Sequence, residues 1–147
     1  RSKDKRFPRP KVKDSFDFSF SGLKTALLRR AQERGWYPPK DEDGPKSESL
    51  AAVAAAFQEA MVDTMVTGTL LAVKQYDVKG VLLGGGVAAN SLLRKEMSAR
   101  SPVQVVVPEP QLCTDNGAMI GAAAWFHLRG ELKQQWDMDV HPQLNLG

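Results

Sequence analysis

The chain has 147 residues, of which 42% are hydrophobic and 25% are charged, and a net charge of +3. These totals fit one soluble globular domain with its own core and are too small for two ordinary domains. They exclude an internal disulfide, because Cys113 is the only cysteine, and we therefore expect a cytoplasmic setting. We also expect no membrane span, since no apolar run reaches about 18 residues.

The first 13 residues are strongly basic. They hold seven Lys and Arg residues against one Asp, a charge of +6 that leaves −3 for the rest of the chain. Such an arm can bind nucleic acid through phosphates, but a solvated terminus has the same composition. We expect residues 1–13 to be a flexible basic arm ahead of a single α/β lobe at 14–147. Because no Met begins the chain, we also expect it to be a fragment.

The next segment predicts a short strand that runs into a helix. Asp17–Phe20 alternates between polar and apolar residues, Ser21 is a suitable N-cap, and Gly35 is a suitable helix end. The apolar stripe between them consists of Leu23, Ala26, Leu27 and Ala31. Residues 36–46, "WYPPKDEDGPK", contain three prolines and predict an exposed loop.

A long helix is predicted over residues 47–77. Its apolar residues recur at helical spacing, at Leu50, Val53, Phe57, Met61, Met65 and Ala72. Its many alanines favour helix and let neighbours approach closely, so we expect the central packing helix of the fold. The methionines fit a core better than a ligand surface, and Gly68 is a candidate position for a bend.

The second half of the chain alternates between strands and helices. "KGVLLGGG" and Val103–Val107 predict two short apolar strands, of the kind that a parallel sheet buries on both faces. Helices are predicted in "ANSLLRKEMSAR" and in "TDNGAMIGAAAWFHLRG", the latter capped by Thr114 and ended by Gly130. The pattern indicates a helix-rich α/β fold with a thin, incomplete sheet.

Two polar stretches follow the predicted strands, where open α/β sheets bind ligands. Gly84–Asn90 offers bare backbone, a helix N-terminus, and Asn90 as a bidentate partner for a base or ribose. Its glycines are equally consistent with a purely structural turn. In Cys113–Gly117, Asp115 is either an acid that caps a helix or an oxygen ligand for a metal.

Other candidate residues favour structural roles. His127 and His141 lack the spacing of a zinc site, and Cys113 has no evident base beside it, so we expect a buried thiol rather than a reactive one. No Ser–His–Asp arrangement can be drawn from the sequence.

Four motifs in order resemble one family over about Phe7 to Gly130. They are "FPRP" at 7–10, "DFSFSGLKTA" at 17–26, "LLGGGVAANSLLR" at 82–94 and "CTDNGAMIGAAA" at 113–124. They are similar to the carboxyl-terminal half of the tRNA N6-adenosine threonylcarbamoyltransferases, formerly called O-sialoglycoprotein endopeptidases or glycoproteases. The resemblance implies one lobe of the actin/Hsp70/sugar-kinase fold. It also implies transfer of a threonylcarbamoyl group from threonylcarbamoyl-adenylate to N6 of the adenosine beside the anticodon.

The resemblance also implies roles for single residues. Asn90 matches the family's adenylate-contacting Asn, Gly85 and Gly86 match its adenosine-side loop, and Asp115 matches a ligand of its divalent metal, iron or zinc. Ser21 and Lys24 are characteristic but have no assigned role. The implied partners are tRNA, a paralogue of the same fold and, in bacteria, a small ATPase.

One departure from the family matters for activity. The family's metal-binding His-x-x-x-His motif and its phosphate-side glycine loop belong to its amino-terminal half, and neither is present in this sequence. No catalytic residue is therefore assigned, and we expect neither catalysis nor tight metal binding from this chain alone. Two alternatives are a glycoprotease-type metalloprotease and a non-catalytic nucleotide-binding or scaffold lobe; a kinase of the same superfold is more distant. We also expect the isolated lobe to self-associate, which sedimentation tests.

Overall fold

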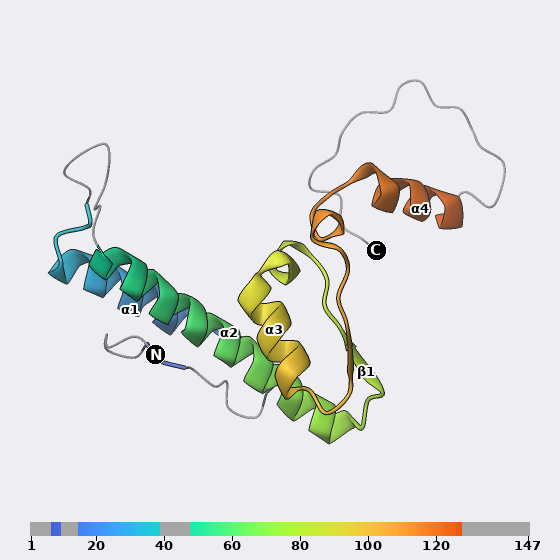
Figure 1. The fold of residues 1–147 in the computed structure, drawn as a ribbon, viewed down its shortest axis with the longest axis horizontal. Helices are drawn as coiled ribbons and strands as arrows, with labels where there is room; N and C mark the ends of the chain where they lie inside the picture. Colours follow the sequence, from blue (N-terminus) through green and yellow to red (C-terminus); the bar gives the residue numbers. More distant parts are fainter. Residues whose placement is uncertain (1–6, 10–14, 39–47, 128–147) are drawn as a thin grey trace. The chain divides into compact units, whose positions relative to one another are not determined.

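The computed structural model describes residues 7–9, 15–38 and 48–127. Its elements are α1 (Ser21–Glu33), α2 (Glu48–Tyr76), β1 (Gly80–Leu82), the 3-10 turn η1 (Gly86–Ala89), α3 (Ser91–Arg100), β2 (Gln104–Val106), the 3-10 turn η2 (Pro110–Leu112) and α4 (Gly117–His127) (Figure 1). The chain divides into two compact units, Arg1–Thr114 and Asp115–Gly147, and each is described by itself. The predicted helix-rich α/β mixture is confirmed.

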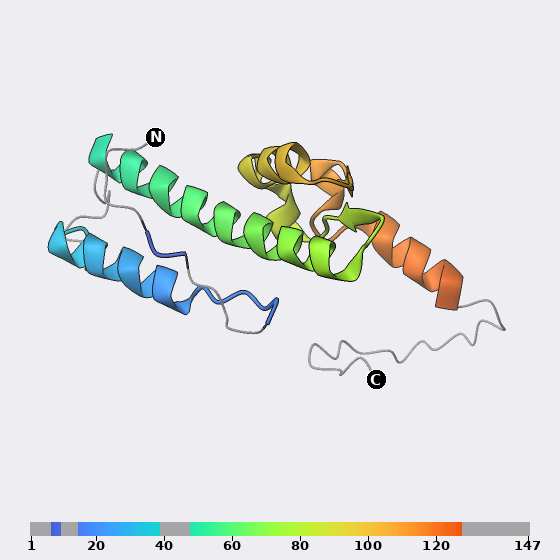
Figure 2. The same ribbon diagram turned by 90° about the horizontal axis from the view of Figure 1, so that it is seen from below.

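Helix α2 is the packing axis of the first unit, as its alanine-rich stripe predicts. Its N-terminal half packs against α1, and its C-terminal half packs against α3 (Figure 2). The first core cluster consists of Phe7, Leu23, Val53, Ala56 and Ala60; the second consists of Val62, Val66, Leu93 and Met97. Met61 and Met65 pack against these clusters, which confirms their predicted role in the core.

Over Leu50–Tyr76, α2 is long and apolar enough to cross a membrane by length and composition alone. The sequence led us to expect no stretch of that kind. The core helix of a soluble protein passes the same test, and α2 carries buried residues of both clusters.

Helix α1 begins and ends close to where the sequence places it. Phe20 holds the N-cap position without a side-chain hydrogen bond, so Ser21 is the first helical residue rather than the cap. At the other end, Gly35 has φ of +68°, the Gly35 amide bonds the Gln32 carbonyl, and the Trp36 amide bonds the Ala31 carbonyl. This is the Schellman arrangement. It favours glycine at position 35, because the backbone there is left-handed.

The strand predicted at Asp17–Phe20 does not form. Residues 15–20 have no regular structure, and aromatic contacts with α2 replace strand pairing. The Phe16 and Tyr76 rings lie 5.5 Å apart, and the Phe18 ring lies against Gly68. A Cβ built on Gly68 would come within 2.7 Å of that ring, so the structure gives this glycine a role in close approach.

Within the described residues, the sheet has two parallel strands, β1 and β2, in the register Val81↔Val105. Side chains alternate between the faces of a strand. Val81 and Val105 face the second core cluster, whereas Leu82 and Val106 point away and are 76% and 50% exposed. The prediction that both faces are buried is therefore wrong, because described helices cover only one face.

Candidate functional site

The glycine loop after β1 is a turn with exposed backbone. Gly85 has φ of +76°, a conformation that residues with a Cβ rarely adopt. The Ala88 amide then bonds the Gly85 carbonyl at 2.9 Å, and the Asn90 amide bonds the Val87 carbonyl at 3.0 Å. A Cβ on Gly84, Gly85 or Gly86 would meet nothing within 4 Å. The turn itself therefore requires glycine at position 85, while the other two glycines leave open space beside the backbone.

Asn90 joins this loop to α3 and caps the helix. Its side-chain Oδ1 accepts a hydrogen bond from the Leu93 amide at 3.0 Å. The amide oxygen therefore already accepts the capping hydrogen bond, and the Nδ2 group is left as the donor to a ligand. The bidentate role predicted from the sequence becomes mainly a donor role in this geometry.

Asn90 also lines an apolar groove of about 600 Å³ in the first unit. The walls come from α1, α2, the segment after α1 and the glycine loop. Its lining residues are Leu27, Ala31, Trp36, Tyr37, Leu50, Val53, Ala54, Phe57, Gln58, Met61, Val62, Met65, Val87 and Asn90. A largely apolar wall with a few polar groups is the usual composition of a small-molecule site.

Asp115 is exposed and precedes α4 in the second unit. The cap of α4 is neither Asp115 nor the predicted Thr114. Instead, the Asn116 Oδ1 accepts a hydrogen bond from the Met119 amide at 3.0 Å, because Asn116 directly precedes the first helical residue. The Gly130 helix end and His141 lie outside the described residues, and His127 is exposed at the end of α4.

The metal role of Asp115 finds no completing ligands in the part of the chain that the structure describes. No group of three His, Cys, Asp or Glu side chains comes together there as a metal ion would need. These residues therefore do not fit a metal site on their own, and we derive no step through a metal.

Cys113 is buried, as predicted, with 4% of its surface exposed. Its sulfur accepts a hydrogen bond from Nη2 of Arg94 at 3.0 Å, and the thiol lies 3.6 Å from the Glu109 carbonyl. Arg94 belongs to the motif at 82–94, yet the sequence offered no reason to single it out.

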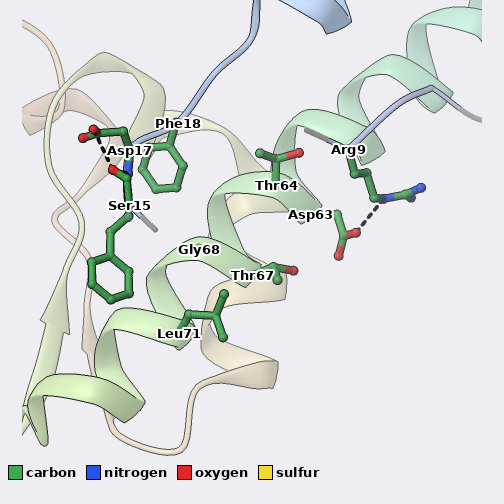
Figure 3. Close-up of a pocket in the computed structure, with 10 residues that line it drawn as sticks. Arg9, Ser15, Asp17, Phe18, Asp63, Thr64, Thr67, Gly68 and Leu71 are labelled. Atoms are coloured by element: carbon green, nitrogen blue, oxygen red, sulfur yellow. Dashed lines mark hydrogen bonds and ion pairs between the residues drawn. The ribbon is translucent and has the colours of Figure 1, made fainter. Parts of the chain in front are cut away.

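A second cavity, of about 140 Å³, lies between Arg9 and residues 15–18 on one side and the middle of α2 on the other (Figure 3). Several of its polar groups already pair with one another or with neighbours. Ser15 donates to Asp17 at 2.7 Å, and Nε of Arg9 lies 2.6 Å from Asp63. Because these groups are paired, the cavity gives less reason to expect a ligand than the groove at Asn90.

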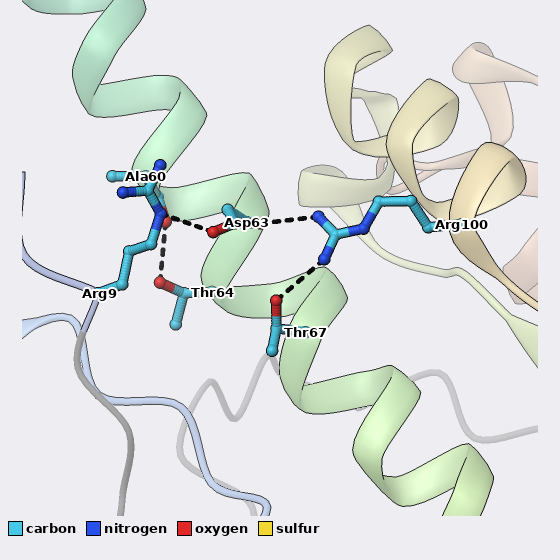
Figure 4. A network of polar contacts seen from close by, with 6 residues as sticks. All are labelled: Arg9, Ala60, Asp63, Thr64, Thr67 and Arg100. Carbon is cyan, nitrogen blue, oxygen red and sulfur yellow. Dashed lines mark hydrogen bonds and ion pairs between the residues drawn. The ribbon is translucent and has the colours of Figure 1, made fainter. Parts of the chain in front are cut away.

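Asp63 joins two arginines from distant parts of the chain (Figure 4). Arg9 contacts one carboxylate oxygen, and Nη1 of Arg100, the last residue of α3, contacts the other at 2.7 Å. Nη2 of Arg100 also donates to Thr67 at 3.1 Å. Burial raises the pKa of Asp63, but the hydrogen bond from Arg100 and the charges of Arg9 and Arg100 outweigh burial and hold that pKa below its ordinary value.

This lowered pKa predicts how acid affects stability. The folded state binds the Asp63 proton more weakly than the unfolded state, so the stabilisation is complete above about pH 4 and is lost as pH falls through the folded pKa. In urea unfolding between pH 5 and pH 2, Asp63→Asn should lose less stability than the parent. The difference between the two proteins in the stability that they lose should stay below about 1 kcal/mol, because Asp63 and its arginine partners are partly exposed. Glu59→Gln, at an exposed site of α2, is the control; parallel curves for Asp63→Asn and the parent would contradict the prediction.

Comparison with known proteins finds one family model and several relatives that are similar to this chain. A family model described as tRNA N6-adenosine threonylcarbamoyltransferase matches residues 1–122. A protein of that name from Dehalococcoides mccartyi is 45% identical over 139 residues, which cover 95% of this chain and 39% of the relative. Those from Thermomicrobium roseum and Halalkalibacterium halodurans are 41% and 43% identical, over 95% and 96% of this chain and 41% and 40% of their own length. The chain thus spans about two fifths of these curated relatives.

Proposed function

This chain belongs to the tRNA N6-adenosine threonylcarbamoyltransferase family, and on that premise we propose that it serves in threonylcarbamoyl transfer to tRNA. In this reaction, N6 of the adenosine beside the anticodon attacks the carbonyl carbon of threonylcarbamoyl-adenylate. A C–N bond forms, the bond from that carbon to the phosphate oxygen breaks, the amine loses a proton, and AMP leaves. The chain's part is the adenosine-side wall of the substrate cleft.

The observation that carries this assignment is that Asn90 lines an apolar groove and follows closely on the bare backbone of Gly84–Gly86. Gly84–Gly86 leave space for a planar ligand to rest on the backbone, and Asn90 lines the groove from the end of the same loop. The Nδ2 group of Asn90 can donate to an acceptor on the base or ribose, while the apolar wall excludes water from the base. These residues bind and orient the leaving nucleotide.

The remaining parts of the proposal rest on the family. We place the chain within one lobe of the actin/Hsp70/sugar-kinase fold, and we assign Asp115 as one oxygen ligand of a divalent metal, iron or zinc. The proposed partners are tRNA, a paralogue of the same fold and a small ATPase, in the cytoplasm. Self-association of the chain would cover the exposed Leu82 and Val106 of the sheet. Transfer assays with this chain alone should give no product.

Calorimetric titration with ATP and GTP tests the adenosine assignment. We expect the chain to bind ATP with a Kd below about 1 mM, an affinity of roughly 4 kcal/mol, and to bind GTP more weakly. Equal binding of both nucleotides would contradict recognition of adenosine. Binding of neither would show that this chain does not form the proposed wall by itself.

A further inference from the structure

Arg94 links the segments that follow the two strands. It lies in the first turns of α3, and its half-buried side chain reaches in two directions. Its Nε donates to the Ala88 carbonyl at 2.6 Å, and its Nη2 donates to Cys113 Sγ at 3.0 Å. Ala88 belongs to η1, after the glycine loop, while Cys113 directly follows η2. One guanidinium therefore bonds both segments.

Both ends of this link are anchored in the interior. Ala88 and Cys113 are 2% and 4% exposed, and η1 and η2 pack against each other. The thiol of Cys113 faces the Glu109 carbonyl at 3.6 Å, which orients the sulfur as an acceptor towards Arg94. Charge-assisted hydrogen bonds between partly buried groups are stronger than neutral surface ones, so the link can fix the loop more firmly than the turn's own bonds.

The shape of the arginine side chain explains why this residue suits the position. A guanidinium is planar and presents its donors at fixed angles, so two bonds to two acceptors fix the relative position of those acceptors. A lysine carries equal charge on a single nitrogen and cannot reproduce this fork. The requirement is thus for geometry, and charge alone should not satisfy it.

We propose that Arg94 is a positioning residue for the adenosine-side loop, and that Cys113 is its anchor. By bonding Ala88, Arg94 holds the turn that carries Gly85 and Gly86, and through α3 it shares a rigid element with Asn90. The inference rests on the proposed function only where it names that loop as a nucleotide site. The mechanical link itself is a separate claim and can be tested separately.

Amide hydrogen exchange tests the link without a nucleotide. The reporters are the Ala88 and Asn90 amides, whose bonds close the turn, and the Val66 amide in α2 is the internal reference. Arg94→Lys and Cys113→Ala should each speed exchange at Ala88 and Asn90 by about tenfold relative to Val66. Cys113→Ser keeps an acceptor at the same place and should restore slow exchange. If Arg94→Lys fails to fold, the Ala and Ser variants of Cys113 still decide the result.

Two results would overturn the proposal. The first is unchanged exchange at Ala88 and Asn90 in the Cys113→Ala chain. The second is an equal increase at Val66, which would mean general destabilisation. A parallel ATP titration separates this claim from the proposed function: Arg94→Lys and Cys113→Ala should weaken ATP binding about tenfold, and Cys113→Ser should not. If the parent chain binds no ATP, this chain does not form the proposed nucleotide wall by itself, while the exchange data still decide the role of Arg94.

Discussion

Asn90→Ser should lower the affinity for ATP by at least about tenfold while leaving α3 capped. Serine is as good an N-cap as asparagine, so the bond that the Leu93 amide makes to residue 90 survives the change. Serine lacks the Nδ2 donor, and its side chain is shorter than that of asparagine. The loss of one good hydrogen bond to a ligand in a largely apolar groove corresponds to about 1.5 kcal/mol or more, which is about tenfold in Kd. Calorimetry on both proteins measures it.

A second variant separates capping from ligand binding. Asn90→Ala removes the cap and the donor together, so it should bind ATP as poorly as Asn90→Ser and also lose about 1 kcal/mol of stability. Urea unfolding of the two variants gives that difference. If Asn90→Ser binds ATP like the parent, Asn90 serves only to cap α3, and its assignment to the nucleotide is wrong.

Leu93→Ala should lower the free energy of unfolding by about 2–5 kcal/mol. Leu93 is 4% exposed in the second core cluster, where α3 meets α2, and its removal leaves a cavity beside Val66 and Met97. For a domain of this size the loss is a large fraction of total stability. Urea unfolding followed by circular dichroism measures the change.

The matched control for this variant is Ser98→Ala, at an exposed position of the same helix. It should change stability by less than about 0.5 kcal/mol. A loss below about 1 kcal/mol in Leu93→Ala would show that α3 does not depend on its packing against α2. The loop position that we assign to Asn90 would then lack its main support.

The elements that the sequence predicts well are those with a strong local signal. The long apolar period predicts α2, and Gly35 predicts the end of α1. The alternation at Asp17–Phe20 misleads, because aromatic residues that pack on a helix produce the same pattern as a short strand. In "TDNG", Thr114 and Asn116 are both good caps, and local preference does not choose between them.

In the candidate site, too, residues with a strong local signal can be predicted from the sequence and residues without one cannot. The glycine loop stands out because three consecutive glycines are rare in a helix-rich chain, and Asn90 follows directly. Arg94 does not stand out, because one of its partners lies 19 residues away and no local pattern encodes that contact. The second role of Asn90, as the cap of α3, becomes visible only from its hydrogen bond to Leu93.

We propose that the glycine loop and Asn90 form the adenosine-side wall of a nucleotide site. The most direct measurement is an NMR titration of the isotopically labelled chain with ATP, following the backbone amides. We expect the shifts to concentrate at Gly84–Leu93 and at groove residues such as Trp36, with little change around Arg9 and Asp63. Shifts centred on the cavity at Arg9 and Asp63, or none at the glycine loop under saturating ATP, would contradict it.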